Sequence, residues 1–181
     1  MMFRSVLLIV SAAGLLSAQQ IKFPAAFERL AEKASETVNV TLDSQTLSFA
    51  TKFLSDKKDE ADVKRIAQKI KGIYVRGYEF DKEGEYTDKD LSDIRSQLKG
   101  PEWSVIVSTR SKRDREISEI YLHRDGGLLI IAAEPKELTI VNIMGNIDPS
   151  DLTNLSGQFG IPKVSGVPGK GARKNGKDEE E

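Results

Sequence analysis

Acidic side chains are the densest group in this sequence that could take part in chemistry. The segment of residues 81–90 places four carboxylates at nearly alternating positions: Asp81, Glu83, Glu85 and Asp88. Carboxylate oxygens suit a hard cation such as Ca²⁺. However, Gly84 comes too early for an EF-hand loop, and no closing glutamate follows at the required distance. We therefore keep the four acids as metal candidates, but expect a solvated loop before a helix N-terminus, with no metal or other cofactor.

Basic side chains gather in a second short segment, residues 110–115. It contains Arg110, Lys112, Arg113 and Arg115. Such a turn could dock an anionic partner, for example a phosphate-bearing glycan or a lipid headgroup. The alternative is a charged hairpin tip that prevents the sheet edge from pairing with other strands.

Aromatic side chains form a third group, on the strand predicted for residues 73–80. Tyr74, Tyr78 and Phe80 share one face of that strand, with Arg76 among them. If helices cover the opposite face, these aromatics form an exposed binding surface or a contact between two copies of the chain. If helices cover the same face, they are core residues.

The residues that most enzymes rely on are scarce. The chain has no cysteine, which excludes disulfides, thiol catalysis and cysteine-ligated metals. Its single histidine, His123, shares a predicted strand face with Glu119 and Tyr121, but no nucleophile or oxyanion donor is indicated beside them. We therefore expect a protein that is not an enzyme. The remaining enzymatic alternative, a carboxylate-dependent hydrolase, requires acids of segments 81–90 and 116–119 to meet in one pocket.

The overall charge limits which partners are expected, and the N-terminal sequence indicates the compartment. The 27 basic and 28 acidic residues nearly cancel, so no basic face for nucleic acid is expected. Residues 1–18 are typical of a signal peptide, with Arg4 before an apolar stretch at residues 6–16 that is too short to span a bilayer. We expect an exported, soluble protein, periplasmic or extracellular, without a membrane span after cleavage.

Hydrophobic periodicity predicts alternating helices and strands, followed by a run of strands. Helical spacing occurs at residues 24–36, 44–54, 60–70 and 87–98, and a short helix is expected at 152–159. Strand patterns occur at residues 38–42, 73–80, 103–109, 116–124, 128–133 and 138–144.

The four last strands are joined by short turns, which favours an antiparallel meander. With helices packed on one face, the prediction is an α+β two-layer sandwich. The 128–133 run is apolar on both faces, which is typical of an interior strand. The expected organisation is a signal peptide at residues 1–18, a single domain at 19–162 and a disordered tail at 163–181.

Three separated stretches resemble a known family. They are residues 72–85 (GIYVRGYEFDKEGE), 100–112 (GPEWSVIVSTRSK) and 131–162 (IAAEPKELTIVNIMGNIDPSDLTNLSGQFGIP). In this order they are similar to the exported bacterial domain-of-unknown-function family 4252, over roughly residues 26–163. The resemblance implies export and one compact domain. It implies no reaction, ligand or catalytic residue.

These observations favour a non-enzymatic module of the bacterial envelope that binds a protein or a glycan, or pairs with itself. An envelope sensor of a small ligand is the first alternative, and the hydrolase is the second.

Overall fold

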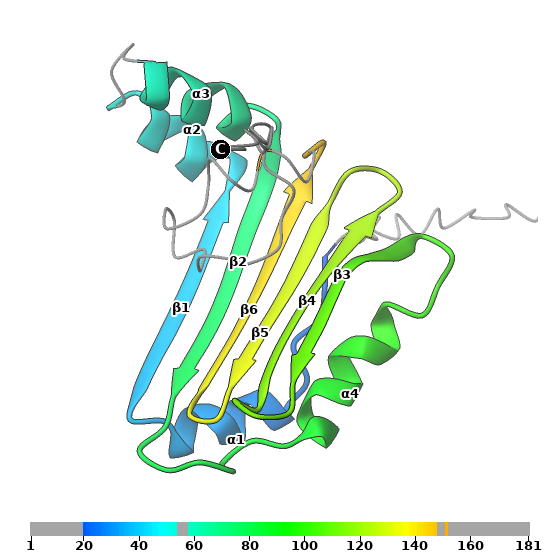
Figure 1. The fold of residues 1–181 in the computed structure, drawn as a ribbon. Helices are drawn as coiled ribbons and strands as arrows, with labels where there is room; N and C mark the ends of the chain where they lie inside the picture. The colour runs from blue at the N-terminus through cyan, green and yellow to red at the C-terminus, as the bar shows by residue number, and fades with distance from the viewer. Residues whose placement is uncertain (1–19, 54–57, 148–150, 152–181) are drawn as a thin grey trace, which may run out of the picture.

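The computed structural model describes residues 20–53, 58–147 and 151. The predicted signal peptide, the predicted helix at 152–159 and the predicted tail at 163–181 lie outside these residues. The described part contains four helices and one six-stranded antiparallel sheet, so the α+β prediction is confirmed (Figure 1). None of its helices is both long and apolar enough to span a membrane.

The strands follow the order β1-β2-β6-β5-β4-β3 across the sheet. The predicted meander of the last four strands is therefore confirmed, and the two earlier strands extend it on the β6 side. The helices are α1 (Ala26–Lys33), α2 (Ser44–Thr51), α3 (Lys58–Ala67) and α4 (Asp88–Gln97). The strands are β1 (Glu36–Asp43), β2 (Ile70–Glu79), β3 (Trp103–Ser111), β4 (Glu116–His123), β5 (Leu128–Glu134) and β6 (Glu137–Gly145).

Carboxylates next to the first turns define where two helices begin. The Asp43 side chain accepts a hydrogen bond from the Thr46 N–H at 2.7 Å and so caps α2. At α4 the Asp90 carboxylate accepts from both the backbone N–H and the hydroxyl of Thr87, each at 2.8 Å. Thr87 followed three residues later by Asp90 is a capping-box pattern, and the structure contains it.

Two strands depart from the simple alternation in the sequence. In β3 the pairing with β4 shifts between Val105 and Val107, which is a β-bulge. The bulge turns Val107 toward the opposite face from Trp103, although the sequence pattern places both on one face. Ile70, which completes a helical stripe in the sequence, instead begins β2, because α3 ends at Ala67.

Helices contribute to both faces of the sheet, so the expectation that they pack on one face is wrong in part. On the first face, α1 and α4 place Phe27, Leu30, Leu91 and Ile94 against the sheet. On the second face, Leu47 of α2 and Ile66 of α3 join a separate cluster. Figure 1 shows α1 behind the lower end of the sheet, α4 beside β3, and α2 and α3 together at the end where β1 finishes. Central strands that are apolar on both faces make this possible.

Candidate binding site

A short segment ahead of α1, residues 20–23, is held against the first face of the sheet. The Ile21 N–H donates to the side-chain oxygen of Asn142 at 3.1 Å. The amide of Gln97 clamps Lys22 by accepting from its N–H at 3.0 Å and donating to its carbonyl at 2.8 Å. Asn142 is fully buried in β6 and also donates to the Leu128 carbonyl at 3.2 Å. These bonds satisfy a buried amide and fix the position of the segment.

A cavity of about 360 Å³ lies between this segment and strands β1 and β2. Its polar lining includes Lys22 from the segment, Thr41 from β1, and Tyr74 and Arg76 from β2. Thr41 and Tyr74 are direct partners in the β1–β2 register, so both side chains stand on the first face. Among the described residues, the lining includes two cations and no carboxylate, which makes the cavity attractive to anions.

Arg76 is the central side chain of the cavity. Its guanidinium carbon lies 5.0 Å from the centre of the Phe23 ring, a cation–π distance. Its Nη1 donates to the Val75 carbonyl at 2.9 Å. Within the part of the chain that the structure describes, no carboxylate forms an ion pair with this guanidinium. A smaller hollow of about 160 Å³ shares Phe23 and Arg76 with this cavity and is bordered by Glu28.

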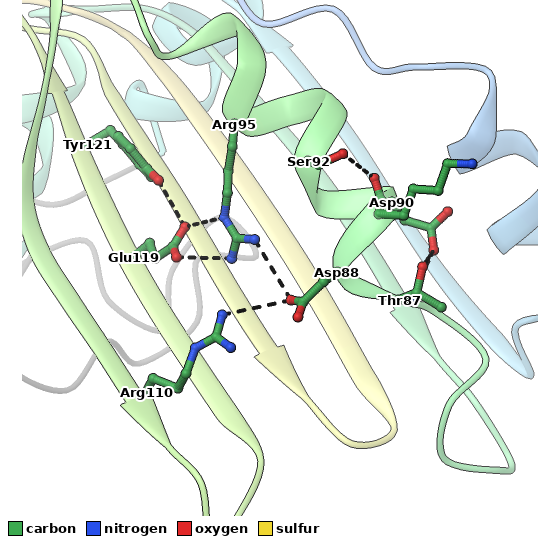
Figure 2. Close-up of polar contacts among 9 residues, drawn as sticks. Thr87, Asp88, Asp90, Ser92, Arg95, Arg110, Glu119 and Tyr121 are labelled. Carbon is green, nitrogen blue, oxygen red and sulfur yellow. Dashed lines mark hydrogen bonds and ion pairs between the residues drawn. The ribbon is translucent and has the colours of Figure 1, made fainter.

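A polar network ties α4 to the sheet elsewhere on the first face (Figure 2). Glu119 of β4 accepts two hydrogen bonds from Arg95 of α4, each at 2.9 Å, and a third from the Tyr121 hydroxyl at 2.9 Å. Arg95 also lies 3.8 Å from Asp88, which lies 3.8 Å from Arg110. Burial and the hydrogen bond with Glu119 raise the pKa of Tyr121 to about 12. The network therefore consists of matched charges around a neutral phenol.

Comparison with known proteins identifies the family. A sequence model of DUF4252, a domain of unknown function, matches residues 30–155. The chain belongs to the DUF4252 family. No curated protein and no solved structure matches the chain. The DUF4252 match contains all six strands of the sheet, and with them Thr41, Tyr74 and Arg76. The segment of residues 20–23, which forms the other wall of the cavity, precedes the match.

The three aromatic residues singled out in the sequence separate in the DUF4252 fold. Tyr78 and Phe80 are buried, with stacked rings 6.5 Å apart, and Tyr78 also contacts Phe27 of α1. Tyr74 is half-buried and lines the cavity. Only Tyr74 is therefore placed to contact a ligand in the larger cavity. Arg76 lies on the same face but is not among the site residues that the sequence predicts. Its position between Tyr74 and Tyr78 on one strand face is the sequence feature that could have indicated it.

Three of the four acidic candidates lie beside basic side chains on different elements. Glu83 pairs with Arg115, Glu85 lies 3.4 Å from Lys33, and Asp88 contacts Arg95 and Arg110. The backbone carbonyl of Asp81 accepts a hydrogen bond from Lys136 at 2.9 Å. Within residues 20–53, 58–147 and 151, no group of three or more acids or histidines is placed to hold a metal ion.

The basic turn is largely charge-matched. Arg110 lies 3.8 Å from Asp88, Arg113 lies 3.6 Å from Asp114, and Arg115 pairs with Glu83. Lys112, at the tip of the turn, is exposed. The turn is thus less able to attract an anion than the cavity around Arg76, whose described lining residues include no acid.

His123 is buried and lies edge-on to Trp103, with ring centres 4.9 Å apart. Its Nδ1 accepts a hydrogen bond from the Asp125 N–H at 3.1 Å, whereas its Nε2 has no hydrogen-bond partner. It stands on the same face of β4 as Glu119 and Tyr121, as the sequence indicates, but it is not joined to them by a hydrogen bond in the described structure. His123 is therefore separate from the polar network.

Proposed function

We propose that this DUF4252 domain is a non-enzymatic binding module of the bacterial envelope, and that the cavity beside β1 binds a small ligand carrying a carboxylate or phosphate group. The observation that carries the proposal is Arg76. Its guanidinium is fixed by Phe23 and the Val75 carbonyl, and it faces a cavity whose other charged side chain is Lys22. A guanidinium with unused N–H groups matches the planar, bidentate geometry of a carboxylate or phosphate.

The size and surroundings of the cavity support a small ligand. A volume of about 360 Å³ falls within the usual range for small-molecule sites. Phe23 and Tyr74 supply flat apolar surfaces for the body of the ligand, while Thr41 supplies a hydroxyl. A compact anion with a small organic body fits this combination better than a long polymer does.

The contacts of the acidic residues favour binding over hydrolysis. Asp88 of α4 and Glu119 of β4, from the two segments that the hydrolase alternative names, both contact Arg95. However, Arg95 bridges them, and Glu119 already accepts three hydrogen bonds. Neither acid lines either of the two cavities described above. A general acid or base needs access to substrate, but Glu119 is largely buried, and the exposed Asp88 lies outside both cavities.

Ligand-induced stabilisation tests the proposal. The purified protein is screened by thermal shift and then calorimetry against inorganic phosphate, sugar phosphates, short carboxylic acids and neutral sugars. We expect one or more anionic compounds to raise the melting temperature, and no comparable effect from the neutral sugars. Added salt should weaken binding, because part of the attraction is between charges.

Arg76→Gln is the decisive variant, because it removes the charge and keeps a polar side chain. We expect its affinity for the anionic ligand to fall at least about tenfold. Arg113→Gln is the matched control, because this arginine is almost fully exposed at the basic turn and should leave binding unchanged. Equal affinity of Arg76→Gln and the unaltered protein would refute the cavity as the site.

The sensor alternative uses the same cavity and differs in its consequence. The segment of residues 20–23 forms one wall of the cavity and is tied to α4 through Gln97. A sensor would change the position of this segment when the anion binds. Amide exchange of α4 near Gln97, which does not line the cavity, separates the two functions when it is measured with and without ligand, since simple binding should slow exchange only near the cavity.

A further inference from the structure

The two edges of the sheet are built differently. The β3 edge has a bulge between Val105 and Val107 and ends near the basic turn, and Figure 1 shows α4 beside it. The β1 edge pairs with β2 in unbroken register from Glu36 to Asp43. It has no bulge, proline, lysine or arginine. In the described part of the chain, no strand pairs with the outer side of β1.

An unprotected edge of this kind is a ready site for another strand. Proteins usually guard edge strands with bulges, prolines or inward-facing charges, because the free N–H and carbonyl groups otherwise pair with a neighbour. The central part of β1, residues 37–42, reads TVNVTL and is uncharged and rich in β-branched residues. Val38 on this strand is 48% exposed.

We propose that β1 pairs antiparallel with β1 of a second copy of the chain, which joins the two sheets across a two-fold axis at Val40. Residues directly opposite one another in such a pair stand on the same face. With Val40 opposite its own copy, Val38 is opposite Leu42, and all of these stand on the second face. The exposed Val38 then gains an apolar neighbour.

The polar residues of β1 are compatible with the same register. On the first face, Asn39 is opposite Thr41, so two hydrogen-bonding side chains meet. Glu36 is opposite Ser44 and Asp43 is opposite Thr37, so no two carboxylates are directly opposed. Centring the pair on Asn39 instead would place Glu36 opposite Leu42, a poorer match. The strand is therefore self-complementary in one register.

Because the β3 edge is guarded, a closed dimer is expected and not a long assembly of many copies. A contact made by the same surface on both partners is closed by two-fold symmetry and stops at two. A chain with two open edges would instead form long assemblies. In the proposed dimer, the β1 edge, which is the only unguarded edge of the described sheet, is paired with its copy.

Solution mass is the first test. Sedimentation equilibrium of the purified full chain should give a mass approaching twice that of one chain as concentration rises. Val38→Lys should raise the dissociation constant at least tenfold, because it places a charge opposite Leu42 of the other copy. Since Val38 is already half-exposed, the fold of a single copy should tolerate the lysine. Thr109→Lys is the matched control, because Thr109 is exposed on the same face of the other edge strand and should leave the mass unchanged.

Cross-linking tests the register independently of folding stability. The chain has no cysteine, so Val40→Cys introduces the only thiol, and any disulfide must join two copies. Opposed residues of an antiparallel pair have Cβ atoms about 5 Å apart, within reach of a disulfide after small adjustment. We expect a covalent dimer for Val40→Cys and little for Thr109→Cys under the same oxidation.

Three outcomes would overturn the proposal. The unaltered protein could remain a monomer at all concentrations, which would leave the β1 edge to a different protein or to none. Val38→Lys and Thr109→Lys could associate equally well. Thr109→Cys could cross-link as readily as Val40→Cys. Because neither edge residue lines the larger cavity, failure here is distinct from failure of anion binding.

Discussion

The phenol of Tyr121, which belongs to the polar network, makes the stability of the protein depend on pH. Burial and the hydrogen bond to Glu119 raise the pKa of Tyr121 to about 12, from an ordinary value of 10.0. The folded state therefore retains this proton at pH values where the unfolded chain loses it. The stabilisation is complete below about pH 10 and is lost as the pH rises toward about 12. Burial also raises the pKa of Tyr86 to about 12, which adds to the effect.

We predict that the free energy of unfolding declines between pH 10 and 12, and that Tyr121→Phe declines less steeply. The difference should be on the order of 1 kcal/mol, because part of the charge on Tyr121 remains screened by solvent. At neutral pH the variant should be about 1 kcal/mol less stable, since Glu119 loses one donor. Urea unfolding at pH 8, 10 and 11 measures both effects. Parallel pH curves for the two proteins would contradict the assignment.

The sequence indicates part of the candidate site and misses the rest for a definite reason. Alternation on β2 places Tyr74 and Arg76 on one face, which is correct. It cannot show that Phe23, from a segment far earlier in the chain, comes to lie against Arg76. It likewise cannot show that the arginine of α4 joins Glu119. Periodicity gives the face of a residue, whereas partners depend on how elements pack.

At the scale of elements, local signals predict the beginnings of helices better than the phase of strands. The carboxylates of Asp43 and Asp90 act where their sequence context indicates, because a cap depends on neighbouring residues alone. The bulge in β3 reverses the phase after Val105, because it depends on pairing with β4. Ile70 belongs to β2 for a similar reason, since its partner on β6 is Gly145.

Gly145 offers a test of how closely β6 approaches the beginning of β2. Its φ is +136°, and a Cβ there would lie 2.2 Å from the Lys69 carbonyl oxygen. We expect Gly145→Ala to lower the free energy of unfolding by roughly 3 kcal/mol, from strain and a clash with backbone. Gly84 also has a positive φ, +81°, but its Cβ would meet nothing within 4 Å. Gly84→Ala should cost only about 1 kcal/mol.

Chemical denaturation of both glycine variants separates the cost of a steric clash from the cost of the positive φ. Both substitutions impose a left-handed backbone on alanine, but only the one at Gly145 also collides with another strand. Similar losses of stability for the two variants would show that the close approach at the end of β6 is relaxed in solution.

For the molecule as a whole, composition and strand order predict the fold class but not the distribution of helices. The 128–133 run is apolar on both faces and so signals that both faces of the sheet are covered. The pattern does not indicate which helix covers which face. That choice depends on α2 and α3 turning back over the end of β1 and β2, where Leu47 and Ile66 join the second cluster.

The β5–β6 hairpin is covered on both faces, and this determines how local unfolding can reach its amides. Every residue from Leu138 to Gly145 is buried, and alternate side chains of β6 enter different clusters. Freeing a β6 amide therefore requires both clusters to open together. We predict that β6 amides exchange with deuterium at the slowest rates, set by global unfolding. The outer amides of β1 should exchange quickly in dilute solution and more slowly as concentration rises. Mass spectrometry at two protein concentrations would show whether amide exchange at the open edge depends on concentration while exchange at the centre of the sheet does not.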